Sequence, residues 1–202
     1  MSARRARLVG AGLTAIAMTL VVVGTSLAAA TAKNPSTLVL RQADFARGAT
    51  YEADDFVDQH YGDALDAAGV DYEEANYIGL TYSEAKGSLR VSGWVIVTPS
   101  AAQARKAFAA AQKGQASWLR AIRSPKLAPL TLPSYGNQQA AGLDAIDPGT
   151  GIGYATVIVR KNSVVWFLHV GHERRPPRSQ VELLADLRRF AAKQARRVGT
   201  GA

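Results

Sequence analysis

In residues 51–68 of this 202-residue chain, the spacing of the hydrophobic positions follows the period of a helix. Four residues follow one another at spacings of three and four, which places them on one helix face: Phe56, His60, Ala64 and Ala67. The spacing predicts a helix over residues 51–68, with Thr50 as its N-cap and Gly69 as its C-cap. Acidic residues in the first turn suit the helix dipole, so they need no functional explanation.

The middle of the chain alternates between strand and helix patterns. Residues 77–82 and 89–98 are predicted strands joined by a polar turn. An alanine-rich helix then runs from the Thr98 turn to about Gly114, and a shorter helix continues from Trp118.

The last third of the chain begins with a proline-rich crossover over residues 124–136, where three prolines exclude an ordinary helix. Three strands follow, and a meander is their simplest arrangement: residues 138–146, 154–160 and 164–170. The final helix opens with a capping box formed by Ser179 and Glu182. Its inward stripe consists of Leu183, Leu184, Leu187, Phe190 and Ala191.

This order of elements, α-ββ-α-βββ-α, predicts an α+β fold. We expect a single domain over residues 38–198, in which a mostly antiparallel, five-stranded sheet packs against helices. Residues 33–37 would form a short leader and residues 199–202 a tail. A domain of this length buries roughly 70% of its unfolded surface, which is enough for one hydrophobic core.

The predicted strand over residues 164–170 is apolar on both faces. One face carries Val164, Trp166, Leu168 and Val170, and the other carries Val165, Phe167 and His169. The strand over residues 89–98 repeats this less strongly, with Trp94 and Ile96 on its second face. A sheet covered on one side only would alternate more clearly, so we expect the second face to be covered too. Helices or the proline-rich segment would do this, and so would a bound apolar ligand or a homodimer partner.

The first 32 residues read as an export signal. Arg4, Arg5 and Arg7 precede an uncharged apolar run that ends in small residues. Ala30 and Ala32 suit a signal-peptidase cut before Lys33. The alternative is an uncleaved membrane anchor through residues 8–32, because about 20 apolar residues are enough to cross a bilayer. Either outcome places the domain outside the cytoplasm.

Charge is segregated along the chain. Eleven acids and one base lie between Asp44 and Glu84, whereas eighteen bases and five acids lie from Lys86 onwards. The two halves would attract one another within the fold, or the basic half would meet an anionic polymer or lipid headgroups. The final helix supplies the candidate polyanion-binding residues Arg188, Arg189, Lys193, Arg196 and Arg197.

Histidines offer the only candidates for catalysis or metal binding. His60 lies one helical turn from Asp63, a spacing that would let the carboxylate orient the imidazole as a general base. His169, His172 and Glu173 include metal-ligating types, but alternation along a strand places His169 and His172 on opposite faces. We therefore expect no catalytic residue and no metal site.

No other cofactor is implied. The spaced glycines of residues 149–153 superficially resemble a phosphate loop, but the strand predicted after them makes a hairpin turn the better interpretation. The chain has no cysteine, so it forms no disulfide. Five tyrosines lie among the acids and would bind sugars or simply pack: Tyr51, Tyr61, Tyr72, Tyr77 and Tyr82.

Two stretches carry a family likeness. Residues 92–108, SGWVIVTPSAAQARKAF, form a strand leading into a helix, and residues 157–166, VIVRKNSVVW, form two strands joined at Arg160-Lys161-Asn162. With the helical ending, they resemble small exported actinobacterial domains such as the extracellular sensor domain of serine/threonine kinases and related cell-envelope proteins. The likeness covers residues 38–198, without the disulfides of the kinase sensors. It implies an envelope binding or accessory domain without established catalysis.

Together these observations predict a non-enzymatic, exported binding or accessory protein of the bacterial envelope. Its ligand or protein partner would contact either the second sheet face or the basic final helix. Nucleic acid is not an expected partner, because the protein is exported. The candidate ligand-binding residues on the sheet are Trp94, Trp166, Phe167 and His169. The alternative function is a histidine-dependent or metal-dependent hydrolase.

Overall fold

The computed structural model describes residues 33–54, 58–83, 87–121, 128–143, 153–173 and 180–200. The predicted export signal and the capping residue Ser179 lie outside these ranges. Residues Thr31–Ala202 form one compact unit. None of the helices within the described ranges combines the length and the apolarity that a membrane crossing requires.

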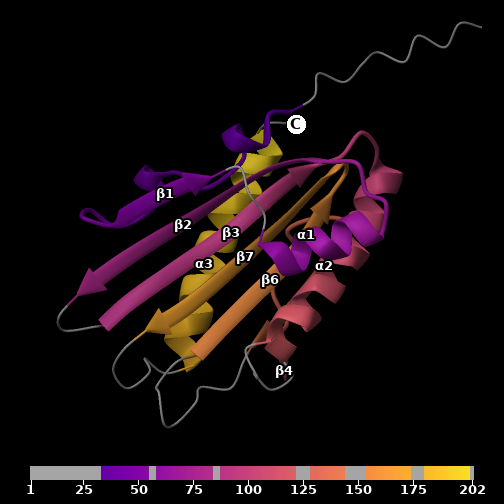
Figure 1. The fold of residues 1–202 in the computed structure, drawn as a ribbon. Coiled ribbons are helices and arrows are strands. Elements are labelled where there is room, and N and C mark those ends of the chain that lie inside the picture. Colours follow the sequence, from indigo (N-terminus) through magenta and orange to yellow (C-terminus); the bar gives the residue numbers. More distant parts are fainter. Residues whose placement is uncertain are drawn as a thin grey trace, which may run out of the picture. The chain divides into compact units, whose positions relative to one another are not determined.

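Seven strands and three α-helices make up the described part of this unit (Figure 1). The strands are β1 (Thr50–Asp54), β2 (Glu73–Ser83), β3 (Gly87–Val97), β4 (Ala128–Pro129), β5 (Gln138–Leu143), β6 (Gly153–Lys161) and β7 (Val164–Glu173). The helices are α1 (Gln59–Ala67), α2 (Ala101–Ala121) and α3 (Gln180–Thr200), preceded by two short 3₁₀ helices at Pro35–Thr37 and Gln42–Asp44.

All strands join one antiparallel sheet in the order β1-β2-β3-β7-β6-β5-β4. The β2–β3 hairpin and the β5-β6-β7 meander meet where β3 pairs with β7. Asn162 takes a positive φ of 55° in the β6–β7 turn, as Asn does readily. The α+β class and the antiparallel sheet are therefore confirmed, but the sheet has seven strands, not five.

The predicted first helix is wrong over its first third. Thr50–Asp54 forms the edge strand β1, and α1 begins only at Gln59. The N-cap is Asp58, whose carboxylate accepts a hydrogen bond of 3.0 Å from the backbone N–H of His60. Gly69 does follow the helix end, with a φ of +60°. Pairing with β2 stabilises β1, and a local helical period cannot detect such a partner.

The helix predicted to stop near Gly114 continues through Trp118 to Ala121. Gly114 stays helical because it lies against α1, where an added Cβ would come within 2.9 Å of the backbone of His60 and Tyr61. This glycine therefore allows two helices to approach closely and does not end one. The continuous helix carries Trp118 onto the sheet face that α1 covers.

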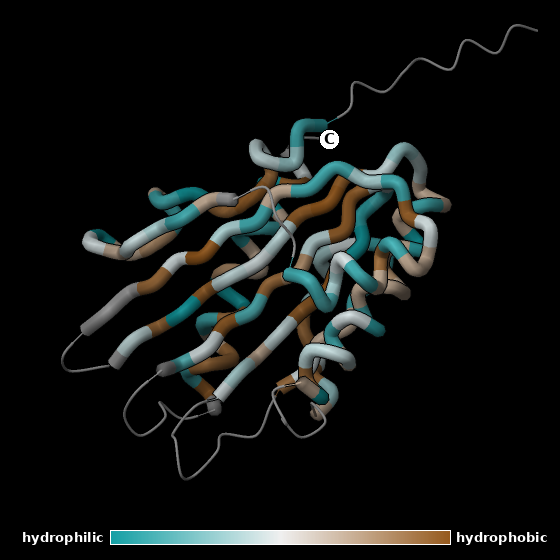
Figure 2. Tube along the Cα trace, viewed as in Figure 1, coloured by the Kyte–Doolittle hydropathy of each residue, from teal (hydrophilic) through white to brown (hydrophobic). Residues whose placement is uncertain are grey.

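Helices cover both faces of the sheet, as the two apolar faces of the 164–170 strand predicted. In Figure 1, α3 lies on one side of the sheet and α1 and α2 on the other. The α3 face buries Trp166, Leu168 and Val170 together with Leu187 and Phe190 of the helix. The α1–α2 face buries a smaller core, which includes the large side chains Tyr61, Leu65, Trp94, Ile96, Phe108, Ile158 and Phe167. Figure 2 shows hydrophobic residues running along the central strands.

Candidate functional site

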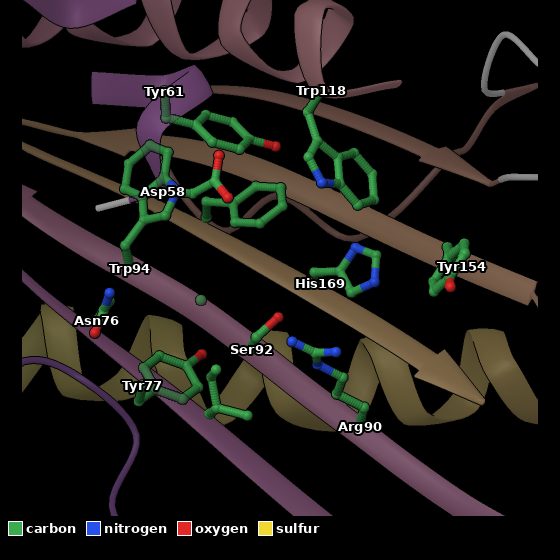
Figure 3. Close-up of a pocket in the computed structure, with 13 residues that line it drawn as sticks. Asp58, Tyr61, Asn76, Tyr77, Arg90, Ser92, Trp94, Trp118, Tyr154 and His169 are labelled. Atoms are coloured by element: carbon green, nitrogen blue, oxygen red, sulfur yellow. The ribbon is translucent and has the colours of Figure 1, made fainter. Parts of the chain in front are cut away.

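A cavity of about 380 Å³ opens on the sheet face that α1 and α2 cover only in part (Figure 3). Its floor is formed by β2, β3, β6 and β7, and its wall by the start of α1 and the end of α2. The volume lies toward the lower end of the range for small-molecule sites. The lining residues are Asp58, Tyr61, Asn76, Tyr77, Ile78, Arg90, Ser92, Gly93, Trp94, Trp118, Tyr154, Phe167 and His169.

Three buried aromatic rings form the inner end of the cavity. Trp94 and Phe167, paired across β3 and β7, stack with centroids 5.6 Å apart. Tyr61 of α1 contacts both rings, at 5.4 Å from Trp94 and 5.0 Å from Phe167. The Tyr61 hydroxyl and the Trp94 indole N–H are buried and have no hydrogen-bond partner among the described residues. Burial raises the pKa of Tyr61, so its hydroxyl keeps its proton and remains a donor.

A second aromatic group, Trp118, Tyr154 and His169, lines the more open part. The His169 ring lies 4.8 Å from Tyr154 and 5.3 Å from Trp118, and 6.3 Å from Phe167 of the inner group. Trp118 and Tyr154 are both half-buried, so ring faces remain accessible from the cavity. Burial, with the nearby charge of Arg90, lowers the pKa of His169 to about 3. The imidazole is therefore neutral near pH 7, with one donor and one acceptor nitrogen.

Polar side chains complete the lining. Arg90 and Ser92 project from β3 on the same face as Trp94, because side chains alternate along a strand. Ser92 lies between Ile78 of β2 and His169 of β7. Figure 3 shows Arg90, Ser92 and His169 toward one side of the cavity and Asp58 toward the other. The cavity thus combines aromatic faces with hydrogen-bonding groups.

Local structure fixes these positions. The Asp58 cap starts α1 so that Tyr61 falls within the first turn, above the sheet. Gln115 of α2 donates a hydrogen bond of 2.5 Å to the Thr156 hydroxyl on β6, which anchors the helix end that carries Trp118. Gly171, opposite Arg90, leaves room for Tyr154, since a Cβ there would lie 2.8 Å from the tyrosine ring.

Three of the four candidate ligand-binding residues line this cavity: Trp94, Phe167 and His169. Trp166 lies on the opposite face, fully buried under α3, so the structure does not bring it to the site. Among the acid-flanked tyrosines, Tyr61 and Tyr77 reach the lining, although the ring of Tyr77 packs against Phe45 on the α3 face. Tyr51 and Tyr72 do not line it, and the Tyr82 side chain is outside the described part.

Sequence reasoning missed Arg90, Ser92, Trp118 and Tyr154. One signal was present: on the second face of β3, apolar Trp94 and Ile96 give way to polar Arg90 and Ser92. That change marks where the helices cease to cover the strand.

Some of the basic residues of α3 pair with Asp44 or Asp186 within the fold. The Arg197 guanidinium lies 2.6 Å from the Asp44 carboxylate, and Lys193 donates to the backbone carbonyl of Asp44. Arg189 pairs with Asp186 at 2.8 Å. The Asp44–Arg197 contact is one example of the expected attraction between the acidic and basic halves of the chain. Arg188 and Arg196 are exposed, and polyanion binding by this helix stays a prediction.

The histidine candidates do not converge. His169 faces the cavity, whereas His172 lies on the α3 face, with Nε2 3.6 Å from Asp186 Oδ2. Within the described ranges, no group of three or more ligating side chains could hold a metal ion. His60 and Asp63 line a separate surface hollow between α1 and α2, together with Lys113, Ser117 and Arg120. The general-base role for His60 belongs to the alternative, hydrolase hypothesis, which nothing in the structure tests.

The fold is similar to that of the extracellular domain of a mycobacterial Ser/Thr kinase. One similar solved structure is the extracellular domain of PknH from Mycobacterium tuberculosis, with a TM-score of 0.54 and 13% sequence identity over 84% of this chain and 96% of that domain. At this identity the likeness shows the fold alone, and it confirms the resemblance to kinase sensor domains expected from the sequence. No protein-family model and no curated protein matches this chain.

Proposed function

We propose that this chain is an extracytoplasmic binding module whose cavity beside α1 and α2 holds a small, ring-bearing molecule. The observation that carries the proposal is the cavity of about 380 Å³, whose lining combines half-buried Trp118 and Tyr154 with polar Asn76 and Ser92. Aromatic faces take up flat rings and the apolar faces of sugars, and a few placed polar groups orient them. The likeness to an extracellular kinase domain supports a location outside the cytoplasm.

Two buried donors add to this argument. The Tyr61 hydroxyl and the Trp94 indole N–H lie in cavity-lining side chains, and most buried polar groups in proteins are hydrogen-bonded. A ligand that reaches the inner end would supply acceptors for both. The cavity is therefore suited to a molecule with an apolar ring and hydrogen-bond acceptors at its edge.

The three tryptophans provide the test. Trp94 and Trp118 line the cavity, and Trp166 is buried on the opposite face. The full chain, labelled with ¹⁵N-tryptophan, is titrated with D-glucose, D-glucuronate, benzamide and benzoate while the three indole N–H signals are recorded. We expect saturable shifts of the Trp94 and Trp118 signals by at least one probe and no shift of the Trp166 signal. Failure of all four probes, or equal movement of all three signals, would contradict the proposal.

A further inference from the structure

One end of the cavity carries a positive charge close to two hydrogen-bonding side chains. Arg90 is two residues from Ser92 on β3, and Ser92 lies directly opposite His169 on β7. The charge of Arg90 acts on His169 strongly enough to contribute to its lowered pKa. In Figure 3 the three side chains lie next to one another beside the open part of the cavity.

The acid that lines the cavity is committed elsewhere. The Asp58 carboxylate caps α1 by accepting the backbone N–H of His60 at 3.0 Å, where it also meets the positive end of the helix dipole. Figure 3 places it toward the other side of the cavity from Arg90. Arg90 is the single cationic side chain among the described lining residues, so the positive charge of the lining lies at this end.

We infer that Arg90, with Ser92 and neutral His169, binds a carboxylate carried on a six-membered ring, and that the ring lies against Trp118 and Tyr154. This inference rests on the proposed function. A guanidinium matches a carboxylate through two parallel N–H···O hydrogen bonds, and its five donors let it hold a ligand together with a protein partner. The Ser92 hydroxyl and the protonated nitrogen of His169 supply further donors to the same group. Gly171, paired with Arg90 on one side and Tyr154 on the other, lets the Tyr154 ring lie close to β7, because a Cβ there would meet that ring.

A bound carboxylate has a second, measurable consequence at His169. The charged or titratable groups in the cavity lining around this imidazole are Arg90 on β3, Tyr77 on β2, Tyr154 on β6, Tyr61 on α1 and Asp58 at the N-cap of α1. An anion beside Arg90 offsets the guanidinium charge, so it raises the pKa of His169 from about 3. A neutral ligand in the same place does not.

The experiment compares two acids with their neutral counterparts on the unmodified full chain. Dissociation constants are measured for D-glucuronate against D-glucose and for benzoate against benzamide, and the His169 ring signal is titrated with pH at saturation. We expect at least one acid to bind tenfold or more tightly than its neutral counterpart and to raise the His169 midpoint. Preference for glucuronate alone supports a sugar acid, and preference for benzoate alone supports an aromatic acid.

Arg90→Gln should reduce acid binding at least tenfold, to the level of the neutral probe, while Arg105→Gln, at an exposed position of α2 outside the lining, should change nothing. An intact Trp166 indole signal verifies the fold of each variant, and the acid-to-neutral comparison stands on the unmodified chain. Equal affinity for acid and neutral probes, or full acid binding by folded Arg90→Gln, overturns the carboxylate inference and leaves the proposed function standing. No binding by any probe overturns both.

Discussion

The indole of Trp94 stacks on the phenyl ring of Phe167, with centroids 5.6 Å apart and planes inclined by 21°. The two residues are directly paired across β3 and β7, at the junction of the hairpin and the meander. Tyr61 of α1 lies against both rings. This stack therefore joins the two halves of the sheet to α1 and also forms the inner end of the cavity.

Phe167→Ala should lower the free energy of unfolding by about 3–5 kcal/mol, because it removes a large buried ring and leaves a void beside Trp94. Urea unfolding followed by circular dichroism measures the change. Val181→Ala is the control, since Val181 is 72% exposed and should change stability by no more than about 0.5 kcal/mol. A similar, small effect of both substitutions would show that the stack is not part of the stabilising core.

The same substitution at two helical glycines should have opposite effects. Gly62→Ala in α1 adds a Cβ into open space and should stabilise the protein by about 0.5–1 kcal/mol, through helix propensity. Gly114→Ala in α2 pushes a Cβ to within 2.9 Å of the α1 backbone and should destabilise it by about 1–3 kcal/mol. Thermal unfolding of both variants gives the two signs. Stabilisation by Gly114→Ala would contradict the close approach of α1 and α2.

His169 should make stability depend on pH. Its pKa is about 3 in the folded chain against an ordinary value of 6.5, so between these values the unfolded chain binds one more proton here. This contribution is fully present above pH 6.5 and is lost as the pH falls toward 3, by about 1.4 kcal/mol for each pH unit. His169→Gln should remove that slope from the unfolding free energy. Ile96→Val is the matched control: it costs about 0.5–1.5 kcal/mol through packing and should keep the wild-type slope.

The contact between Asp44 and Arg197 links the first described segment to the last helix. Asp44→Asn should lower the unfolding free energy by about 1–3 kcal/mol, because it weakens a charge-assisted pair of hydrogen bonds at 2.6 and 2.8 Å. Chemical denaturation gives the value, and Arg188→Ala, which alters an exposed residue on the same helix, should stay within about 0.5 kcal/mol. Equal stability of Asp44→Asn and the unmodified chain would mean that this pair adds nothing to the fold.

Local patterns predicted the elements whose structure depends on near neighbours in sequence. The two apolar sets of the 164–170 strand indicated that both sheet faces are covered, with helices as one of the possible covers, and Gly69 marked the end of α1. The edge strand β1 was missed because its partner lies far along the chain, with Thr50 opposite Leu80. Its few residues carry no signal strong enough to compete with the helical spacing that follows.

The cavity could be predicted only in part for a related reason. Trp94, Phe167 and His169 are on strands whose second face was recognised as unusual. Trp118 reaches them only because α2 continues past Gly114, and that continuation depends on the contact with α1. Where helices stop covering a sheet is decided by tertiary packing, which hydrophobic periodicity does not describe.

The most direct test of the cavity as a binding site is to fill it. Ser92 lines the cavity, between Ile78 and His169, so a phenyl ring in Ser92→Phe would occupy the space over the strands. The dissociation constants of D-glucuronate and benzoate are measured for Ser92→Phe and for Ser92→Ala, which keeps the cavity open. We predict that Ser92→Phe abolishes binding of every probe that the unmodified chain binds, with the Trp166 indole signal unchanged. Ser92→Ala loses one hydroxyl donor and should bind the same probes more weakly, but measurably. Undiminished binding by folded Ser92→Phe would contradict the assignment of this cavity as the ligand site.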